Sequence, residues 1–485
     1  MKRFIGAALA VVLAVIVFPS ASPDKRVAPK KEGPPPVNKR GVSYSFEQDK
    51  TPAEDMALLA PGGDVPGIHW FYNWYVMPEA KAMEAAGDHN VVFYPMVWNP
   101  WAFEPMLEEY LQRHPETEWI MGYNEPNLKD QANMTPKQAA KTWPSLIKFA
   151  KKHNLKVLSP AMNYGWGVGV IEDKRNPGKN KDDGYWSAWR WLNEFFGIDG
   201  LDDPSNDTSK FRKHKGFKGV SLSDVDAISI HCYMPHAGAM KWYINTFKQY
   251  NKPIWLTEFC SWEMTDSLKW QMEVMSEICT YMELDPWVEK YAWFIPKGSE
   301  PETDKPMNKL LTKTTLPEMK PPELTPLGVV YINMGVADKT KWIPTGQRII
   351  AAHFADCNLS EWIDKAGWPG KEHGYPDVTG GSVHFRPGTD STGALDVYDF
   401  SKKKWLEYQV DVPDAKNYTL SVRNTAPEAT VIDIEVDGKA AVTLNLRQSN
   451  TWTTSTVPLT LEAGKHQVRL NVTEGNCTLN WLQLD

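Results

Sequence analysis

The sequence has few cysteines, no excess of basic residues and no glycine-rich phosphate-binding turn. Only 5 of its 485 residues are cysteine, and none forms a CxxC pair, so neither a zinc site nor a disulfide framework is expected. Cys232 and Cys260 each lie next to an expected strand end and could form a bridge, although burial as small apolar side chains is the simpler expectation. The formal net charge of −7 offers no basic surface, so nucleic acid is not an expected partner.

Long apolar runs are also absent, with one exception at the N-terminus. Lys2 and Arg3 precede an apolar run over 4–18, and small residues follow around Ala21. This pattern predicts a signal peptide over 1–21 and a protein that is secreted, extracellular or periplasmic, with no membrane partner after cleavage. A membrane anchor is the alternative, but the run is short for a spanning helix. Residues 22–40 are rich in proline and basic, which predicts an extended linker.

Aromatic residues, in contrast, are abundant. The chain has 22 tryptophans, 18 tyrosines and 17 phenylalanines. Most of them can be explained by a large core. A handful would be enough to line a groove that stacks against the apolar faces of sugar rings.

From Gly41 onwards, short apolar runs alternate with segments long enough for a helix. Eight runs are recognised, at 41–46, 67–74, 90–98, 118–124, 155–163, 225–233, 252–259 and 290–296. Continuous apolar strands linked by helices predict a parallel sheet covered on both sides, and eight units in about 300 residues predict an α/β fold of the (β/α)₈ TIM-barrel type. A doubly wound open sheet is the alternative, but the first strand lacks the glycine-rich turn typical of that fold.

The segments between the runs predict helices, most clearly at 135–153 and 266–284, and a closing helix at 325–336. Segments 165–219 and 298–326 interrupt the repeat and are interpreted as loop insertions. After about residue 346 the pattern changes to short alternating strands separated by turns, which predicts an all-β sandwich of the jelly-roll kind. We therefore expect a barrel domain at 41–340 and a sandwich domain at 346–485.

Two glutamates follow or close apolar runs. Glu125 follows the fourth run in WIMGYNEPN, and Glu258 closes the seventh in KPIWLTEFCSW. The active site of a (β/α)₈ barrel lies at the carboxyl ends of its strands, so these two side chains are expected to face each other. Two carboxylates about 5–5.5 Å apart perform retaining glycoside hydrolysis, one as acid/base and the other as nucleophile. A lone glutamate at a strand end is more often a surface or ion-paired residue, so the prediction of a catalytic site depends on the presence of both glutamates.

Other side chains at strand ends are candidates for binding substrate. Asn124 can donate to a sugar hydroxyl or to the opposite carboxylate, and a tyrosine such as Tyr233 can keep a nucleophile ionised. For His231, a structural role and a site role are equally open. The full set of candidate substrate-binding residues is Asn124, Tyr233, His231, Trp293, Trp74, Trp98, Trp101 and Trp262.

These stretches resemble glycoside hydrolase family 128. The similarity covers roughly 41–335 and is carried by GYNEPN and KPIWLTEF, together with YNW, PMVW, SPA and HCY. The resemblance implies a β-1,3-glucanase on a (β/α)₈ barrel, acting on laminarin- or curdlan-type glucan. By matching motif, Glu125 is implied to be the acid/base and Glu258 the nucleophile.

The C-terminal region is similar to family 6 carbohydrate-binding modules in WLEYQVDVP, TWTTSTVPLTLEAGKHQVRL and LNWLQL. The resemblance implies that Tyr398 and Trp452, with Asn480, contact a sugar; packing inside the sandwich is the alternative. Where such modules often carry an EAE calcium motif, this chain has AAH at 351–353. The loss of both carboxylates argues against a structural calcium ion, and no other cofactor is expected.

Two functions from different classes follow from these observations. The first is a secreted retaining hydrolase of β-1,3-glucan, with mixed-linkage glucan or mannan as alternative substrates. The second is a non-catalytic glycan-binding protein used for adhesion. The presence of both glutamates favours the enzyme.

Overall fold

The computed structural model describes residues 38–46, 51–165, 169–171, 188–199, 212–213, 219–297, 306–313, 320–359, 383–391 and 393–485. The predicted signal peptide and most of the predicted linker lie outside these ranges, as do large parts of the two insertions. In the described part of the chain, no helix combines the length and the hydropathy needed to cross a membrane.

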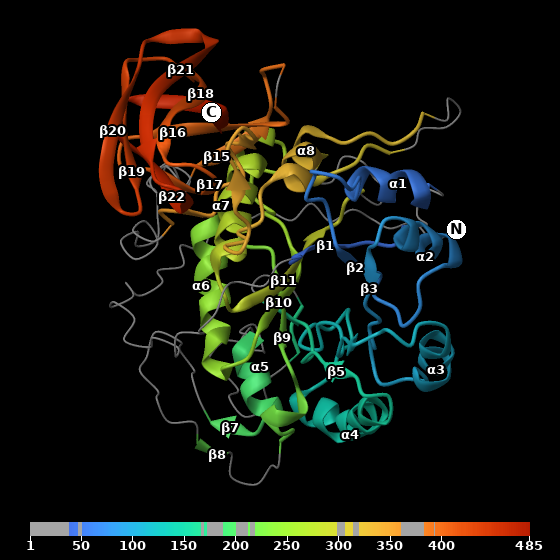
Figure 1. Ribbon diagram of the computed structural model, residues 1–485. Coiled ribbons are helices and arrows are strands. Elements are labelled where there is room, and N and C mark those ends of the chain that lie inside the picture. The colour runs from blue at the N-terminus through green and yellow to red at the C-terminus, as the bar shows by residue number, and fades with distance from the viewer. Residues whose placement is uncertain are drawn as a thin grey trace.

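The N-terminal domain is a barrel of parallel strands enclosed by helices, as predicted (Figure 1). Seven strands pair in the order β3-β2-β1-β11-β10-β9-β6, and β4 pairs with β5. Isolated bridges between Met96 and Met121 and between Leu158 and Ala227 join the two parts into a closed wall. The strands are β1 (Arg40–Ser43), β2 (Trp70–Tyr72), β3 (Val92–Phe93), β4 (Trp119–Ile120), β5 (Lys156–Val157), β6 (Met162–Asn163), β9 (Ile228–Cys232), β10 (Ile254–Phe259) and β11 (Val288–Phe294).

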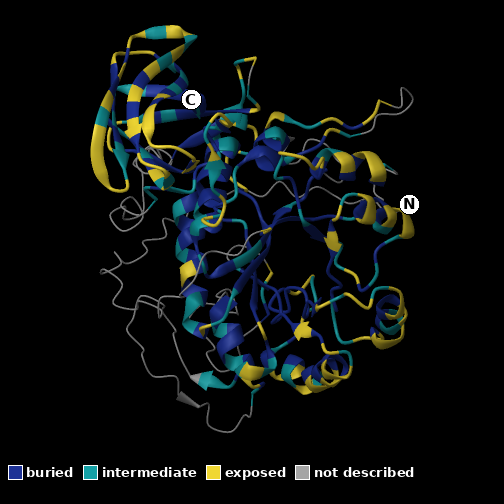
Figure 2. Ribbon diagram, viewed as in Figure 1, coloured by how far each residue is buried: buried dark blue, intermediate teal, exposed yellow. Residues whose placement is uncertain are grey.

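Large aromatic side chains fill the interior of the barrel. Trp70, Trp119 and Trp255 come from three different strands and form a buried cluster with Tyr94, which directly follows β3. The ring centroid of Trp255 lies 4.8–5.6 Å from those of the other three. Because β1 contributes Gly41, Trp70 can lie directly against its backbone; a Cβ atom at Gly41 would come within 2.4 Å of that ring. Much of the aromatic content is therefore core (Figure 2).

Eight α-helices of the described barrel cover its wall. Local sequence signals fix the ends of several. Thr135 forms a reciprocal capping box with Gln138 at the start of α4, Ser267 caps α7, and Thr325 caps α8. The helices are α1 (Pro52–Leu59), α2 (Ala80–Asp88), α3 (Glu104–Arg113), α4 (Pro136–Lys152), α5 (Ala188–Phe195), α6 (Ala237–Phe247), α7 (Leu268–Leu284) and α8 (Pro326–Asn333).

Two expectations from the sequence are wrong, the end of the linker and the absence of a helix from the first insertion. Lys39 and Arg40, assigned to the linker, are fully buried, and Arg40 begins β1. Their charges suggested exposure, but each forms hydrogen bonds inside the barrel, as Lys39 does with the end of α7. The segment assigned to a loop insertion also contains α5, whose Trp191 and Phe195 pack in the core.

The C-terminal domain is a sandwich of two mainly antiparallel sheets, which confirms the predicted fold. One sheet has the order β12-β17-β22-β19-β20, with β14 against β17; the other has β15-β16-β23-β18-β21, with β13 against β23. The strands are β12 (Ile343–Pro344), β13 (Arg348–Ile350), β14 (Asp356–Cys357), β15 (His384–Pro387), β16 (Leu395–Ser401), β17 (Trp405–Val412), β18 (Lys416–Ala426), β19 (Thr430–Val436), β20 (Lys439–Leu446), β21 (Ser449–Leu461), β22 (Gly464–Glu474) and β23 (Asn476–Leu484).

The sandwich packs against the outside of the barrel at α7 and α8 (Figure 1). Strand β15 lies along α7, and the backbone N–H of Phe385 donates to Ser276 Oγ at 2.9 Å. His384 lies between Glu277 of α7 and Asp399 of β16. The two domains therefore share a buried polar interface.

Candidate active site

Glu125 lies just beyond β4, at the carboxyl end of the barrel wall. Its backbone has a φ of 41°, in the left-handed region that non-glycine residues seldom adopt. Two backbone hydrogen bonds hold this conformation, from Glu125 N–H to Ala161 and from Leu128 N–H to Glu125. Gly122 lies three residues before Glu125 and lets the backbone pass close to Trp143, because a Cβ at this position would lie 2.7 Å from the Trp143 ring. Strained backbone of this kind is common at functional sites.

Glu258 lies on β10, and an irregularity in the strand directs it into the barrel. Trp255 faces the interior, so strict alternation would turn Glu258, three residues later, to the opposite face. The pairing of β10 with β9 shifts register between Leu256 and Glu258, which restores the inward direction and sets Glu258 beside His231.

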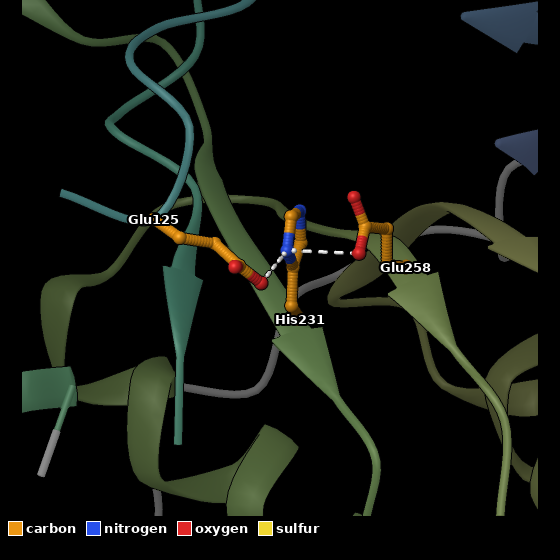
Figure 3. Close-up of side chains that lie close together, drawn as sticks. All are labelled: Glu125, His231 and Glu258. Carbon is orange, nitrogen blue, oxygen red and sulfur yellow. Dashed lines mark hydrogen bonds and ion pairs between the residues drawn. The ribbon is translucent and has the colours of Figure 1, made fainter. Parts of the chain in front are cut away.

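The two carboxylates approach each other across the mouth of the barrel, with His231 between them (Figure 3). His231 Nδ1 lies 2.6 Å from Glu125 Oε1 and 3.2 Å from Glu258 Oε2, and these three atoms all lie within 4.8 Å of one another. All three side chains are buried. The predicted pair of glutamates is therefore brought together.

Hydrogen-bond donors surround the Glu258 carboxylate. Tyr72 OH and Trp74 Nε1 donate to Oε1 at 2.7 and 2.6 Å, and Tyr233 OH donates to Oε2. Burial raises the pKa of Glu258 above its ordinary value, and the charge of His231 and the hydrogen bonds from Tyr233 and Trp74 oppose that rise. Burial, followed by the charge of Glu258, raises the pKa of both tyrosines well above 10, so both remain donors.

Glu125 has a smaller set of partners. Asn163, at the end of β6, donates from Nδ2 to Glu125 Oε1 at 2.7 Å. The same oxygen receives His231 Nδ1, so both contacts fall on Oε1. Burial alone would lower the pKa of His231, but the charge of Glu258 and the hydrogen bond and charge of Glu125 raise it above 6.5. Both carboxylates therefore favour the cationic form of the imidazole, whose Nδ1 atom faces the pair.

Two groups of side chains have the residue types and spacing of a metal site. In the first, Glu125, His231 and Glu258, the phenol and indole donors that point at Glu258 favour a free carboxylate over a metal ligand. In the second, Glu273, His384 and Asp399, each side chain already has a partner within the domain interface, Tyr398 for Glu273 among them. The hydrogen bonds and ion pairs account for both groups.

The other aromatic candidates differ in their positions. Trp262 is 41% exposed and stacks on Tyr233 with ring centroids 4.1 Å apart, beside Glu258. Trp98 is half-buried against the interior cluster. Trp101 is 78% exposed, and among the described residues its ring has no partner. Trp262 and Trp74 thus join the site directly, while Trp98 and Trp101 lie on the loop that leaves β3.

One of the predicted contacts is wrong. Trp293 points outward, away from the site: its ring packs on Phe259 and on Tyr331 of α8, and its Nε1 donates to the Asn308 carbonyl. Its neighbour Phe294 contacts Trp74 and Tyr233 instead. Asn124 was expected to donate to substrate or to the opposite carboxylate.

The Asn124 side-chain amide donates to Gln131 Oε1 at 3.0 Å, and it is Asn163 that reaches a glutamate. The contact of Asn124 with a sugar hydroxyl stays a prediction. Three site residues were not predicted from the sequence: Tyr72, Asn163 and Phe294. Tyr72 alternates with Trp70 on β2, and both side chains therefore lie on the interior face of that strand, which is a signal that could have identified Tyr72.

In the C-terminal domain, the predicted sugar contacts are wrong at two positions. Tyr398 is buried and donates to Glu273 of α7 at 3.1 Å, so its hydroxyl is part of the domain interface. Asn480 is fully buried and donates to Asp396 Oδ1 at 2.8 Å. Trp452 is half-buried, with Nε1 on Thr389 Oγ1 at 3.2 Å. At the AAH segment, His353 lies 2.9 Å from the carbonyl of Asn333 in α8.

The five cysteines are all buried and none is in a disulfide bond, so Cys232 and Cys260 do not form a bridge. Phe259, next to Cys260, pairs with Cys232 across β10 and β9. These side chains act as small apolar groups behind the site.

Comparison with known proteins identifies both domains. Residues 54–331 match the family model described as glycosyl hydrolase catalytic core, and residues 378–485 match the family 6 carbohydrate-binding module. A curated relative, alkali-sensitive linkage protein 1 of Schizosaccharomyces pombe, is 25% identical over 237 residues. That match spans 47% of this chain and only 35% of the relative.

Among solved structures, a glycoside hydrolase family 128 (subgroup II) endo-β-1,3-glucanase from Pseudomonas viridiflava is 30% identical. That match covers 62% of this chain and 99% of the other, with a TM-score of 0.46. A subgroup II endo-β-1,3-glucanase from Sorangium cellulosum is 25% identical, covering 61% and 97%, with a TM-score of 0.42. The recognition of a family 128-type hydrolase followed by a family 6 module is confirmed, and the chain belongs to the glycosyl hydrolase catalytic core family.

Proposed function

We propose that this glycoside hydrolase is exported and cleaves β-1,3-glucan with retention, Glu125 serving as acid/base and Glu258 as nucleophile. The observation that carries the proposal is the separation of the two carboxylates, whose nearest-facing oxygens lie within 4.8 Å of each other. Retaining enzymes have a short separation of about 5–5.5 Å, whereas inverting enzymes leave about 6.5–9.5 Å for a water molecule.

The different surroundings of the glutamates support the division of roles. Glu258 receives hydrogen bonds from Tyr72, Trp74 and Tyr233, and donors to a carboxylate favour its ionised form, which a nucleophile requires. On Glu125, Asn163 and His231 both contact Oε1. Its other oxygen, Oε2, is then the atom that would hold the proton for the leaving group.

The substrate is proposed from the relatives and from the aromatic side chains near the site. The two family 128 relatives are named endo-β-1,3-glucanases, and a third structure of that family, from Amycolatopsis mediterranei, contains laminaritriose. In this chain, the exposed Trp262 stacked on Tyr233 offers a flat apolar surface next to the nucleophile. Sugar rings stack on such surfaces through their C–H faces.

The C-terminal domain is proposed to bind a glucan that keeps the enzyme on its polymer. A related family 6 module, from Cellvibrio mixtus lichenase 5A, was solved with cellotriose, at 20% identity. Of the three residues expected to contact sugar, Trp452 remains the candidate, since its ring is partly exposed near the loop that contains Thr389. Export is proposed from the N-terminal pattern, and sequencing of the secreted protein should find a start near residue 22.

The test measures reducing-sugar release from laminarin, curdlan, mixed-linkage glucan and mannan by the wild type and by Glu125→Gln and Glu258→Gln. We expect turnover on laminarin or curdlan, and a loss of at least about a thousandfold in kcat for both variants. Glu263→Gln is the matched control, because Glu263 is exposed five positions from Glu258. NMR of the first product should show the β-anomer.

Each of the other outcomes would contradict a stated part of the proposal. A first product in the α-anomer would mean inversion, and faster turnover of mannan or mixed-linkage glucan would replace the substrate. Binding of curdlan without turnover by the wild type would favour the adhesion hypothesis over the enzyme.

A further inference from the structure

His231 is the one side chain of the described site that contacts both glutamates. It lies on β9 and is fully buried, and its Nδ1 atom is 2.6 Å from Glu125 Oε1 and 3.2 Å from Glu258 Oε2. Within the described part of the chain, its second nitrogen, Nε2, has no hydrogen-bonding partner. All the polar contacts of the ring are therefore made by one atom, directed at the two carboxylates (Figure 3).

The other donors contact only one glutamate. Asn163 contacts Glu125, while Tyr72, Trp74 and Tyr233 contact Glu258. Among the described residues, no lysine or arginine forms an ion pair with either glutamate. The groups that face the imidazole are thus two carboxylates and neutral donors, and the imidazole is the only group among them that can carry positive charge.

Double displacement moves a negative charge from one side of His231 to the other. In the first step, a Glu258 oxygen bonds to the anomeric carbon, the glycosidic C–O bond breaks, and the leaving oxygen takes the proton of Glu125. Glu258 has then become a neutral ester and Glu125 a carboxylate. In the second step, Glu125 takes a proton from water, the water oxygen bonds to the anomeric carbon, and Glu258 is released as a carboxylate.

We propose that His231 is a positioning residue that compensates this movement of charge: its Nδ1–H faces both carboxylates in the free enzyme, and it interacts with Glu125 alone in the glycosyl-enzyme, where Glu258 is an ester. The proposal rests on the proposed retaining mechanism. The two distances differ by little more than half an ångström, so Nδ1 is within reach of both carboxylates from one position of the ring. A cation placed to stabilise charge in both states serves both chemical steps.

The test separates the two steps with an aryl β-laminaribioside carrying a 2,4-dinitrophenyl leaving group. The pre-steady-state burst gives the rate of glycosyl-enzyme formation, the later phase gives its hydrolysis, and the burst amplitude counts active sites. We expect His231→Gln and His231→Asn to slow both rate constants, each by about tenfold to a hundredfold. The controls are variants of residues that contact only one glutamate. Asn163→Ala should slow mainly the hydrolysis of the glycosyl-enzyme, and Tyr72→Phe should slow mainly its formation.

A second readout distinguishes positioning from a general loss of structure. The charge of His231 lowers the pKa of Glu258. Its removal should therefore shift the acidic limb of the kcat/KM profile to higher pH, which a purely structural role would not do. Rates per active site are unaffected by a misfolded fraction, so the readout holds for a partly folded variant.

Three outcomes settle the question. A shifted acidic limb with both steps slowed supports the inference. The inference is overturned if a His231 variant keeps the wild-type rate in either step, or if its acidic limb does not move. When the wild type is active, this result leaves the proposed function intact. A wild type that shows no burst and no turnover of laminarin contradicts the proposed function itself.

Discussion

At the scale of single residues, the Glu258 carboxylate is held by donors from the ends of two other strands. Tyr72 and Trp74 come from β2 and the turn after it, Tyr233 follows β9, and Glu258 itself is on β10. Trp74 reaches the carboxylate from a backbone with φ of 62°, which is uncommon for a bulky residue. The cost of that conformation is offset by a hydrogen bond to an ionised group, one of the stronger kinds in proteins.

The replacement Trp74→Phe tests this hydrogen bond. It removes the Nε1 donor, which lies 2.6 Å from Glu258 Oε1, and keeps an aromatic ring against Tyr72 and Phe294. A hydrogen bond to a charged group is worth about 1.5–3 kcal/mol, so kcat/KM on laminarin should fall about tenfold to a hundredfold. The acidic limb should also move to higher pH, since Trp74 lowers the pKa of Glu258.

Trp287→Phe is the control for the loss of an indole, because Trp287 lies between α7 and β11, before the start of that strand. Its kcat/KM should match the wild type. An unchanged pH profile in Trp74→Phe would remove the indole N–H from the mechanism.

The sequence could identify the glutamates but could not resolve which neighbouring side chains face them. Glu125 and Glu258 are polar residues at the ends of apolar runs, and that contrast is visible without a structure. In the run that forms β11 every residue near the end is apolar or aromatic, so nothing distinguishes the inward Phe294 from the outward Trp293. The register shift that turns Glu258 inward likewise leaves no mark in the composition of β10.

At the scale of elements, the last turn of α7 is held by a residue from the start of the barrel. Lys39 Nζ donates to the carbonyls of Met282, Glu283 and Asp285 at 2.6–2.9 Å. The last carbonyls of a helix lack partners within it and carry a partial negative charge, so a buried ammonium group there satisfies both needs. This contact closes the barrel between β1 and the helix that follows the nucleophile strand.

We expect Lys39→Met to destabilise the protein by about 2–4 kcal/mol, because it leaves buried carbonyls without their donor. The free energy of unfolding, measured with urea, gives the result. Lys137→Met, at an exposed position of α4, is the control and should change stability by less than about 0.5 kcal/mol. Equal stability of the two variants would show that water replaces Lys39 at no cost.

The elements themselves were largely predictable, because each of the eight apolar runs overlaps at least one barrel strand and the capping residues Thr135 and Thr325 mark real helix starts. The burial of Lys39 and Arg40 was not predictable, since a charged pair next to a proline-rich segment is typical of a solvent-exposed linker. Residues distant in the sequence, in α7 and β11, explain their burial.

At the scale of the whole molecule, the two domains are joined by a buried network of charges. His384 of β15 lies 2.9 Å from Glu277 of α7 through Nε2 and 2.9 Å from Asp399 of β16 through Nδ1. Tyr398 of β16 contacts Glu273 of α7. The use of Tyr398 in this interface is the reason that a sugar contact predicted from its motif was wrong, since a motif does not reveal which face of a domain packs on its neighbour.

This interface predicts how stability depends on pH. Burial alone would lower the pKa of His384, but its hydrogen bonds with Asp399 and Glu277 and the nearby charges raise it to about 9. Because the folded pKa lies above the unfolded value of about 6.5, the stabilisation is fully present below pH 6.5 and is lost as pH rises through 9. A shift of this size corresponds to about 3 kcal/mol.

The melting temperature of the wild type should therefore fall between pH 6.5 and 9.5 by more than that of His384→Gln, which has no such proton to lose. At pH 6.5 the variant should be the less stable of the two. His466→Gln is the matched control: its imidazole pairs with Asp437 at 2.7 Å on the surface, where an ion pair contributes about 1 kcal/mol or less. If the melting temperatures of the wild type and of His384→Gln fall equally between pH 6.5 and 9.5, the interface does not depend on a protonated His384. Apolar packing of β15 on α7 and α8 would then be sufficient to join the domains.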